Sequence, residues 1–189
     1  MKIEDYPIFS DHMDTLKEMS KDTSEGQPQY MTERMEEAVN FDLVKRAYAN
    51  MLGLSEKTAS SCDSLAFLST GPVFIEFKNG KVESANVKTK IRDSLLIYGG
   101  ITGQSIADTR TGMEFILVYN EQKNPDRNPS APASGDAPSR VAIAEYLANK
   151  AKVEYIRFDL DRFQKLYFRA VHTYTPGEFE NYLAEKGLS

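Results

Sequence analysis

Apolar residues follow helical spacing in some segments of the chain and strand-like spacing in others. Helical spacing predicts a short helix beginning at Ser10, a longer helix from about Thr32 to Leu52, and another from Ala85 to Tyr98. Two apolar runs between Cys62 and Gly80 predict a β-hairpin. The apolar run from Gly112 to Tyr119 predicts a strand in the interior of a sheet. Up to residue 119, therefore, helices alternate with strands.

The C-terminal part of the chain continues this alternation. A further helix is predicted from about Arg140 to Lys150, and a strand from Leu166 to Tyr174. The segment from Thr175 to Glu178 has the composition of a helix start, with a capping hydroxyl, a proline at the first helical position and an acid three residues after the cap. The order of elements predicts an α/β domain with a mixed central sheet flanked by helices on both faces.

Composition and charge vary along the chain. Residues 1–30 are rich in acids and end in a polar linker, so we interpret them as an acidic N-terminal segment, and residues 31–189 as a single domain. Residues 120–139 are rich in Pro, Ser, Asn and Asp, which predicts a mobile loop. The acidic excess of residues 1–42 is larger than the net charge of −5, so the remainder is mildly basic. This distribution permits a polyanionic partner without requiring one.

The predicted hairpin carries three charged side chains where charge is costly. Because side chains alternate across a strand, Glu76 and Lys78 lie on one face and Phe77 on the other. A two-residue turn at Thr70-Gly71 would pair Asp63 with Lys78. Glu76 would then lie diagonally across from Asp63. Both faces are otherwise apolar, so these charges must pair with one another or bind a cation.

Several classes of protein are excluded by composition. A single cysteine, Cys62, cannot form an internal disulfide or supply a zinc site built from several cysteines, and a small buried thiol is expected there. The N-terminus lacks a basic region followed by an apolar run, which predicts no secretory signal. No apolar run approaches the roughly 18 residues of a membrane span. These features predict a cytoplasmic protein that does not enter the membrane.

The spacing of Asp63, a gap, and then Glu76-x-Lys78 at the end of a strand resembles the signature of the PD-(D/E)xK nuclease-like superfamily. The resemblance covers residues from roughly 33 to 119 and implies a restriction-endonuclease-like core. It implies that Asp63 and Glu76 bind Mg²⁺ or Mn²⁺ and that Lys78 assists the attacking water. Many members also use a glutamate early in the helix before the first acid, which implies Glu36 or Glu37 and leaves both open. The chain departs from the pattern at Cys62, where the family often has proline, and in having one obvious strand upstream of Glu76 instead of two.

These residue types suit the hydrolysis of phosphodiesters. The reaction requires neutralisation of phosphate charge and a hydroxide near neutral pH, and a divalent ion held by carboxylates serves both needs. The resemblance therefore implies a divalent-metal-dependent nuclease with nucleic acid as its substrate. The alternative is a non-catalytic binding or interaction domain on a nuclease-like scaffold. The sequence gives no indication of the oligomeric state.

Overall fold

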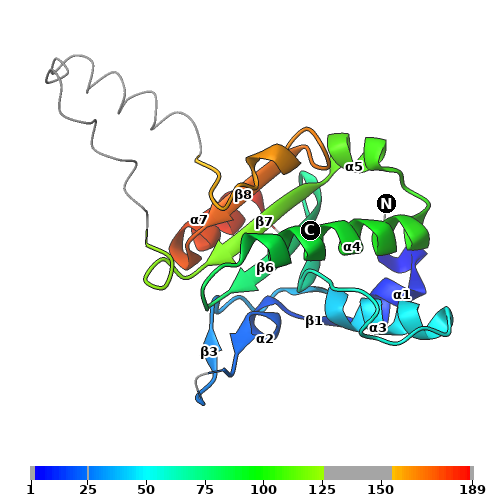
Figure 1. The fold of residues 1–189 in the computed structure, drawn as a ribbon, viewed down its shortest axis with the longest axis horizontal. Helices are drawn as coiled ribbons and strands as arrows, with labels where there is room; N and C mark the ends of the chain where they lie inside the picture. The colour runs from blue at the N-terminus through cyan, green and yellow to red at the C-terminus, as the bar shows by residue number, and fades with distance from the viewer. Residues whose placement is uncertain (1–2, 25, 126–154, 188–189) are drawn as a thin grey trace, which may run out of the picture.

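The centre of the fold is a six-stranded mixed sheet (Figure 1). The structure is a computed structural model and describes residues 3–24, 26–125 and 155–187. In spatial order the strands are β1 (Met13–Thr15), β4 (Glu37–Asn40), β5 (Ser64–Leu68), β6 (Gly71–Lys78), β7 (Glu114–Tyr119) and β8 (Ala170–Tyr174). Neighbours from β1 to β6 pair antiparallel, whereas β6, β7 and β8 pair parallel. A separate two-stranded sheet joins β2 (Lys21–Asp22) to β3 (Gln29–Tyr30).

Helices cover both faces of the central sheet. The longest helices are α3 (Phe41–Met51), α4 (Ser84–Thr102) and α7 (Pro176–Lys186). The shorter ones are η1 (Ile3–Asp5), α1 (Pro7–Ser10), α2 (Leu16–Met19), α5 (Ile106–Gly112) and η2 (Asp161–Phe163). One apolar core joins α1, α3 and α4 to the sheet, and a second core joins α7 to its opposite face. The predicted class, a mixed α/β sheet flanked by helices, is confirmed.

The hairpin of β5 and β6 has the predicted faces but a different turn. Leu68 pairs with Gly71, so the turn residues are Ser69 and Thr70 and not Thr70-Gly71. Gly71 has φ +126°, and a Cβ there would lie 2.7 Å from the carbonyl oxygen of Gly112, so it begins β6 against the neighbouring backbone. Moving the turn by one residue changes each pairing by two residues, which preserves the alternation of faces.

The N-terminal region differs most from the prediction. In place of a helix beginning at Ser10, the chain forms α1, then β1, then α2. β1 pairs with β4, and both Phe9 and Leu16 are fully buried. The residues interpreted as a separate acidic segment therefore contribute an edge strand and core side chains to the main fold.

The helix predicted from Thr32 begins later, at Phe41. Its N-cap is Asn40, whose side-chain oxygen accepts a hydrogen bond from the Leu43 N–H at 3.3 Å. The residues before it form β4, a strand of only four residues. Alternation over so short a segment does not separate a strand from the first turn of a helix, whereas pairing with β1 and β5 does.

Helix α4 continues through Gly99-Gly100, where it was predicted to end, and stops at Gly103, which has φ +73°. A Cβ at Gly100 would overlap the Tyr48 hydroxyl oxygen. The glycine therefore permits close packing of α4 on α3. At the C-terminus, Thr175 and Glu178 form the predicted reciprocal capping contacts of α7.

Two predicted segments fall largely or wholly outside the described residues. The predicted loop at 120–139 is described only as far as residue 125, and the predicted helix from Arg140 to Lys150 lies wholly outside. Within the described ranges, no helix has both the length and the apolar character needed to cross a membrane.

Candidate functional site

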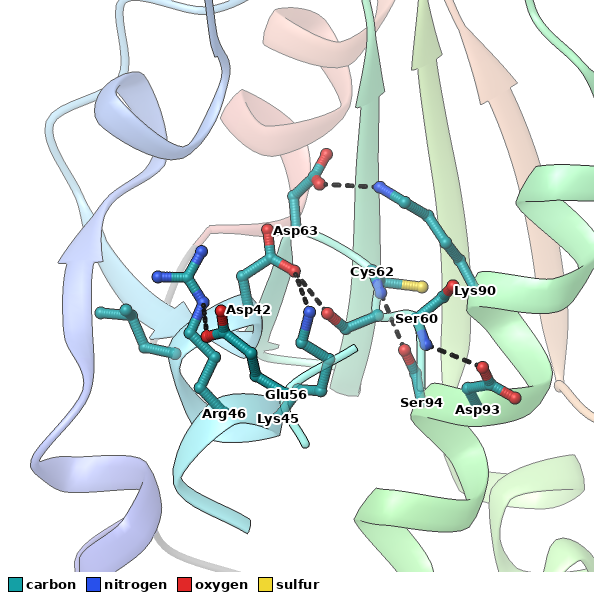
Figure 2. A network of polar contacts seen from close by, with 12 residues as sticks. Asp42, Lys45, Arg46, Glu56, Ser60, Cys62, Asp63, Lys90, Asp93 and Ser94 are labelled. Carbon is teal, nitrogen blue, oxygen red and sulfur yellow. Dashed lines mark hydrogen bonds and ion pairs between the residues drawn. The ribbon is translucent and has the colours of Figure 1, made fainter. Parts of the chain in front are cut away.

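Two acids and one lysine meet where β5, β6 and α4 come together. Asp63 immediately precedes β5, Glu76 lies on β6 and Lys90 on α4. The Lys90 Nζ atom lies 3.1 Å from Asp63 Oδ1 and 2.6 and 2.9 Å from the two carboxylate oxygens of Glu76. Figure 2 shows the lysine reaching from α4 toward Asp63. Both carboxylates therefore contact a single cationic atom.

The two carboxylates are held firmly. Glu76 is 1% exposed. The second oxygen of Asp63, Oδ2, accepts a hydrogen bond from the Phe77 N–H at 2.7 Å, and the carbonyl oxygen of Asp63 accepts one from the Phe41 N–H at 3.0 Å. These main-chain contacts join the start of β5 to both β6 and the first turn of α3. The Asp63 carboxylate is thus oriented by a backbone amide on one oxygen and by Lys90 on the other.

Burial and mutual repulsion govern the protonation of these acids. Burial raises the pKa of Glu76, the negative charge of Asp63 raises it further, and Lys90 only partly opposes them, so the pKa reaches about 8. Burial also raises the pKa of Asp63. Burial lowers the pKa of the Lys90 ammonium, but its contacts with Glu76 and Asp63 outweigh that effect and its pKa lies above the ordinary value. The lysine therefore stays charged at neutral pH.

Lys78 lies on the same face of β6 as Glu76, two residues further along. Its positive charge lowers the pKa of Glu76. The amine in direct contact with both carboxylates is nevertheless Lys90. Asp63 was expected opposite Lys78. In the structure Ser64 pairs with Ile75, so the same register continued by one residue places Asp63 opposite Glu76. This shift brings the two acids closer to each other than predicted.

The structure does not bring Glu36 or Glu37 to this site. Both precede α3 and are not part of a helix: Glu37 is an exposed residue of β4, and Glu36 is exposed and forms an ion pair with Arg34 at 3.0 Å. The expectation that one of them sits on the helix before the first acid is wrong, because that helix begins only after Asn40.

The acid in the first turn of α3 is Asp42. It accepts a hydrogen bond from the Ser61 hydroxyl, and Lys45 Nζ lies 3.7 Å from the same carboxylate oxygen. Its negative charge contributes to the raised pKa of Asp63. Figure 2 shows Asp42 beside Asp63, on the side away from Lys90. Asp42 is thus the acid in the first turn of the helix that precedes Asp63, which is the position expected for Glu36 or Glu37.

Two hydrogen bonds anchor the segment before Asp63 to α4. The Ser60 N–H donates to Asp93 Oδ2, and the Cys62 N–H donates to Ser94 Oγ, each at 2.8 Å (Figure 2). These two bonds fix the segment before β5 against α4, the helix that carries Lys90. Cys62 is the small buried thiol expected, and burial raises its pKa well above the ordinary value.

The basic residues of α4 are engaged within the fold. Lys88 forms an ion pair with Asp159, Arg92 lies over the ring of Phe163 with 5.5 Å to its centroid, and Lys90 occupies the site. Lys90 and Asp42 were both missed as site residues. The sequence feature that could have identified Lys90 was its position in the predicted helix, next to the apolar residues on the buried side of that helix.

A second buried acid, Glu114, lies on the opposite face of the sheet. It accepts hydrogen bonds from Arg169 and Tyr182, and His172 Nε2 lies 3.7 Å from it. Burial alone would favour the neutral acid, but contacts with His172, Tyr182 and Arg169 lower the pKa of Glu114 to about 2. The ionised form of Glu114 is therefore stabilised by its own hydrogen-bond donors, whereas Asp63 and Glu76 share Lys90.

Asp63 and Glu76 form a donor set that suits a hard divalent cation. In the described part of the chain, no three His, Cys, Asp or Glu side chains gather as a metal-binding group. A two-carboxylate set fits Mg²⁺ or Mn²⁺, which bind through one or two carboxylates and retain water molecules. Fold and site together define a mixed α/β domain with a buried two-carboxylate, one-lysine centre. No family model, curated protein or solved structure matches the chain.

Proposed function

We propose that this chain is a divalent-metal-dependent phosphodiesterase that hydrolyses nucleic acid, with Asp63 and Glu76 as the metal ligands. The observation that carries the proposal is the position of Lys90 Nζ, 3.1 Å from one carboxylate and 2.6 Å from the other. A point that accepts an ammonium between two carboxylates has the charge and the oxygen ligands that a divalent ion requires. Asp63 and Glu76 are also the two acids that the resemblance to the PD-(D/E)xK superfamily implies as metal ligands.

The cost of the cluster supports a functional origin. Buried ion pairs stabilise a fold poorly compared with apolar residues of similar volume. Here two carboxylates are held against each other in a largely apolar setting, which raises the pKa of Glu76 to about 8. Strongly perturbed acids of this kind gather at functional sites.

Each residue has a role in this proposal. A divalent ion, when bound, would neutralise phosphate charge and make hydroxide available near neutral pH. Asp63 is oriented by the Phe77 amide, and Glu76 by its burial, so neither must reorganise to act as a ligand. Lys78, on the same face of β6, would orient the attacking water or stabilise negative charge on the substrate.

One observation favours a second candidate function. Lys90 contacts three of the four carboxylate oxygens, and the Phe77 N–H donates to the fourth. The cluster is therefore hydrogen-bonded without a metal. In the second candidate, this cluster is structural and the domain acts by binding a partner without catalysis.

Cleavage assays with matched glutamate variants test the proposal. The purified chain is incubated with single- and double-stranded DNA and RNA in Mg²⁺, in Mn²⁺ and in EDTA. We expect metal-dependent cleavage that falls by about 100-fold or more in Glu76→Gln, because a neutral amide is a poor ligand for Mg²⁺. Glu36→Gln, an exposed site outside the cluster, is the control and should retain full activity. A folded Glu76→Gln variant with unchanged cleavage would refute the assignment.

A further inference from the structure

We infer that Lys90 determines which cations enter the site, because its ammonium already fills the cation position and only a divalent ion can displace it. This inference rests on the proposed function, since it concerns the same pair of carboxylates. It assigns to Lys90 a role in cation selection that is separate from the role of Lys78 in hydrolysis.

The first argument is steric and electrostatic. Lys90 Nζ lies between 2.6 and 3.1 Å from oxygens of both Asp63 and Glu76. A Mg²⁺ ion bound to both carboxylates would lie about 2.1 Å from their oxygens, and therefore very near the ammonium. Two cations cannot share so small a space without strong repulsion. Metal binding therefore requires that the lysine move away.

The second argument concerns charge balance. The two carboxylates carry two negative charges when ionised, and Lys90 supplies one positive charge. A divalent ion would neutralise the pair completely. A monovalent ion would only replace one positive charge by another, and the hydrogen bonds of the ammonium would be lost. Displacement therefore favours divalent over monovalent cations.

The third argument identifies the group that moves. Asp63 is held by the Phe77 N–H, and the side chain of Glu76 is 2% exposed. The side chain of Lys90, by contrast, is 28% exposed. A long lysine stem can stay against the protein while its charged end turns into water. The carboxylates thus keep their places as the ammonium leaves, and the site needs no rearrangement of β5 or β6.

Mn²⁺ titration of Lys90 variants tests this inference without an activity assay. Lys90→Met removes the charge and keeps the length of the side chain, and Lys90→Gln provides a second neutral variant if the first does not fold. Lys88→Met is the matched control, since Lys88 lies two residues earlier on α4 and pairs with Asp159. Calorimetry measures Mn²⁺ dissociation constants, in choline chloride and in KCl at equal ionic strength. Circular dichroism and thermal melting establish that each variant is folded.

We expect neutral Lys90 variants to bind Mn²⁺ about tenfold or more tightly than the unmodified chain, a typical size for coupling between two ligands. Lys88→Met should leave the dissociation constant unchanged. KCl, compared with choline chloride, should weaken Mn²⁺ binding in the Lys90 variants and not in the unmodified chain, because K⁺ can enter only the vacated position.

The outcomes separate this inference from the proposed function. If the unmodified chain and the Lys90 variants bind Mn²⁺ equally, or the variants bind it more weakly, the metal site stands and the role of Lys90 is refuted. Equal sensitivity to KCl in all variants would also refute it. If no folded variant binds Mn²⁺, both the metal site and the inference are overturned.

Discussion

The raised pKa of Glu76 predicts that the metal-free protein loses stability as the pH rises through neutrality. An acid whose pKa is higher in the folded chain than in the unfolded chain stabilises the fold in its protonated form. This stabilisation is fully present at pH values below the unfolded pKa. That stability is lost as the pH rises through the folded pKa. For Glu76 these values are 4.5 and about 8. The loss therefore develops between about pH 4.5 and pH 8.

The expected size follows from the linkage relation. Each pH unit between the two pKa values costs about 1.4 kcal/mol, and the slope flattens near the folded pKa. Between pH 6 and pH 8, Glu76 should therefore lower the free energy of unfolding by about 2 kcal/mol. Glu76→Gln, which cannot ionise, should remove this contribution.

Urea unfolding in EDTA measures the effect. The free energy of unfolding is determined at intervals from pH 6 to pH 8 for the unmodified chain, for Glu76→Gln and for the exposed control Glu36→Gln. We expect the control to follow the unmodified chain and Glu76→Gln to show a flatter profile. Equal slopes for all three proteins would show that Glu76 does not titrate in this range, and the electrostatic reasoning for the site would then be wrong.

Two further predictions concern other parts of the fold. The pKa of Glu114, lowered to about 2, predicts stability that is present above pH 4.5 and is lost as the pH falls toward 2, and urea unfolding should show this acid-dependent loss weakened in Glu114→Gln. Gly100→Ala should destabilise the protein by about 1–3 kcal/mol, because the new Cβ would overlap the Tyr48 hydroxyl. Thermal melting of Gly100→Ala combined with Tyr48→Phe should show part of this loss recovered, and an additive double variant would count against the contact.

The β5–β6 hairpin shows which structural features could be predicted from local sequence pattern and which could not. Alternation along each strand, together with the expected two-residue turn, correctly placed Glu76 and Asp63 on one face, because moving such a turn along the chain changes every pairing by an even number of residues. The exact pairing was beyond local pattern, since the position of Gly71 is determined by close approach to Gly112, which is distant in the sequence. The sequence therefore predicted that the acids share a face and not that they lie opposite each other.

The residues missed at the site depend on tertiary placement. Lys90 could be assigned to a helix, but its contact with Glu76 depends on how α4 rotates and lies against the sheet. Asp42 was overlooked because the start of α3 was predicted too early, and Asn40 was not recognised as its cap. The short N-terminal elements were mispredicted for a related reason. Pairing with β4, and not intrinsic preference, determines their conformation.

The ammonium between the two carboxylates has a consequence for how the molecule matures. Because Lys90 already balances the charge of the two acids, the chain can fold without a bound metal ion. Under the proposed function, folding and metal binding are then separate events, in contrast to small domains that remain unfolded until metal binds. If Asp63 and Glu76 hold a metal as proposed, a chelator would abolish the proposed activity and leave the fold intact.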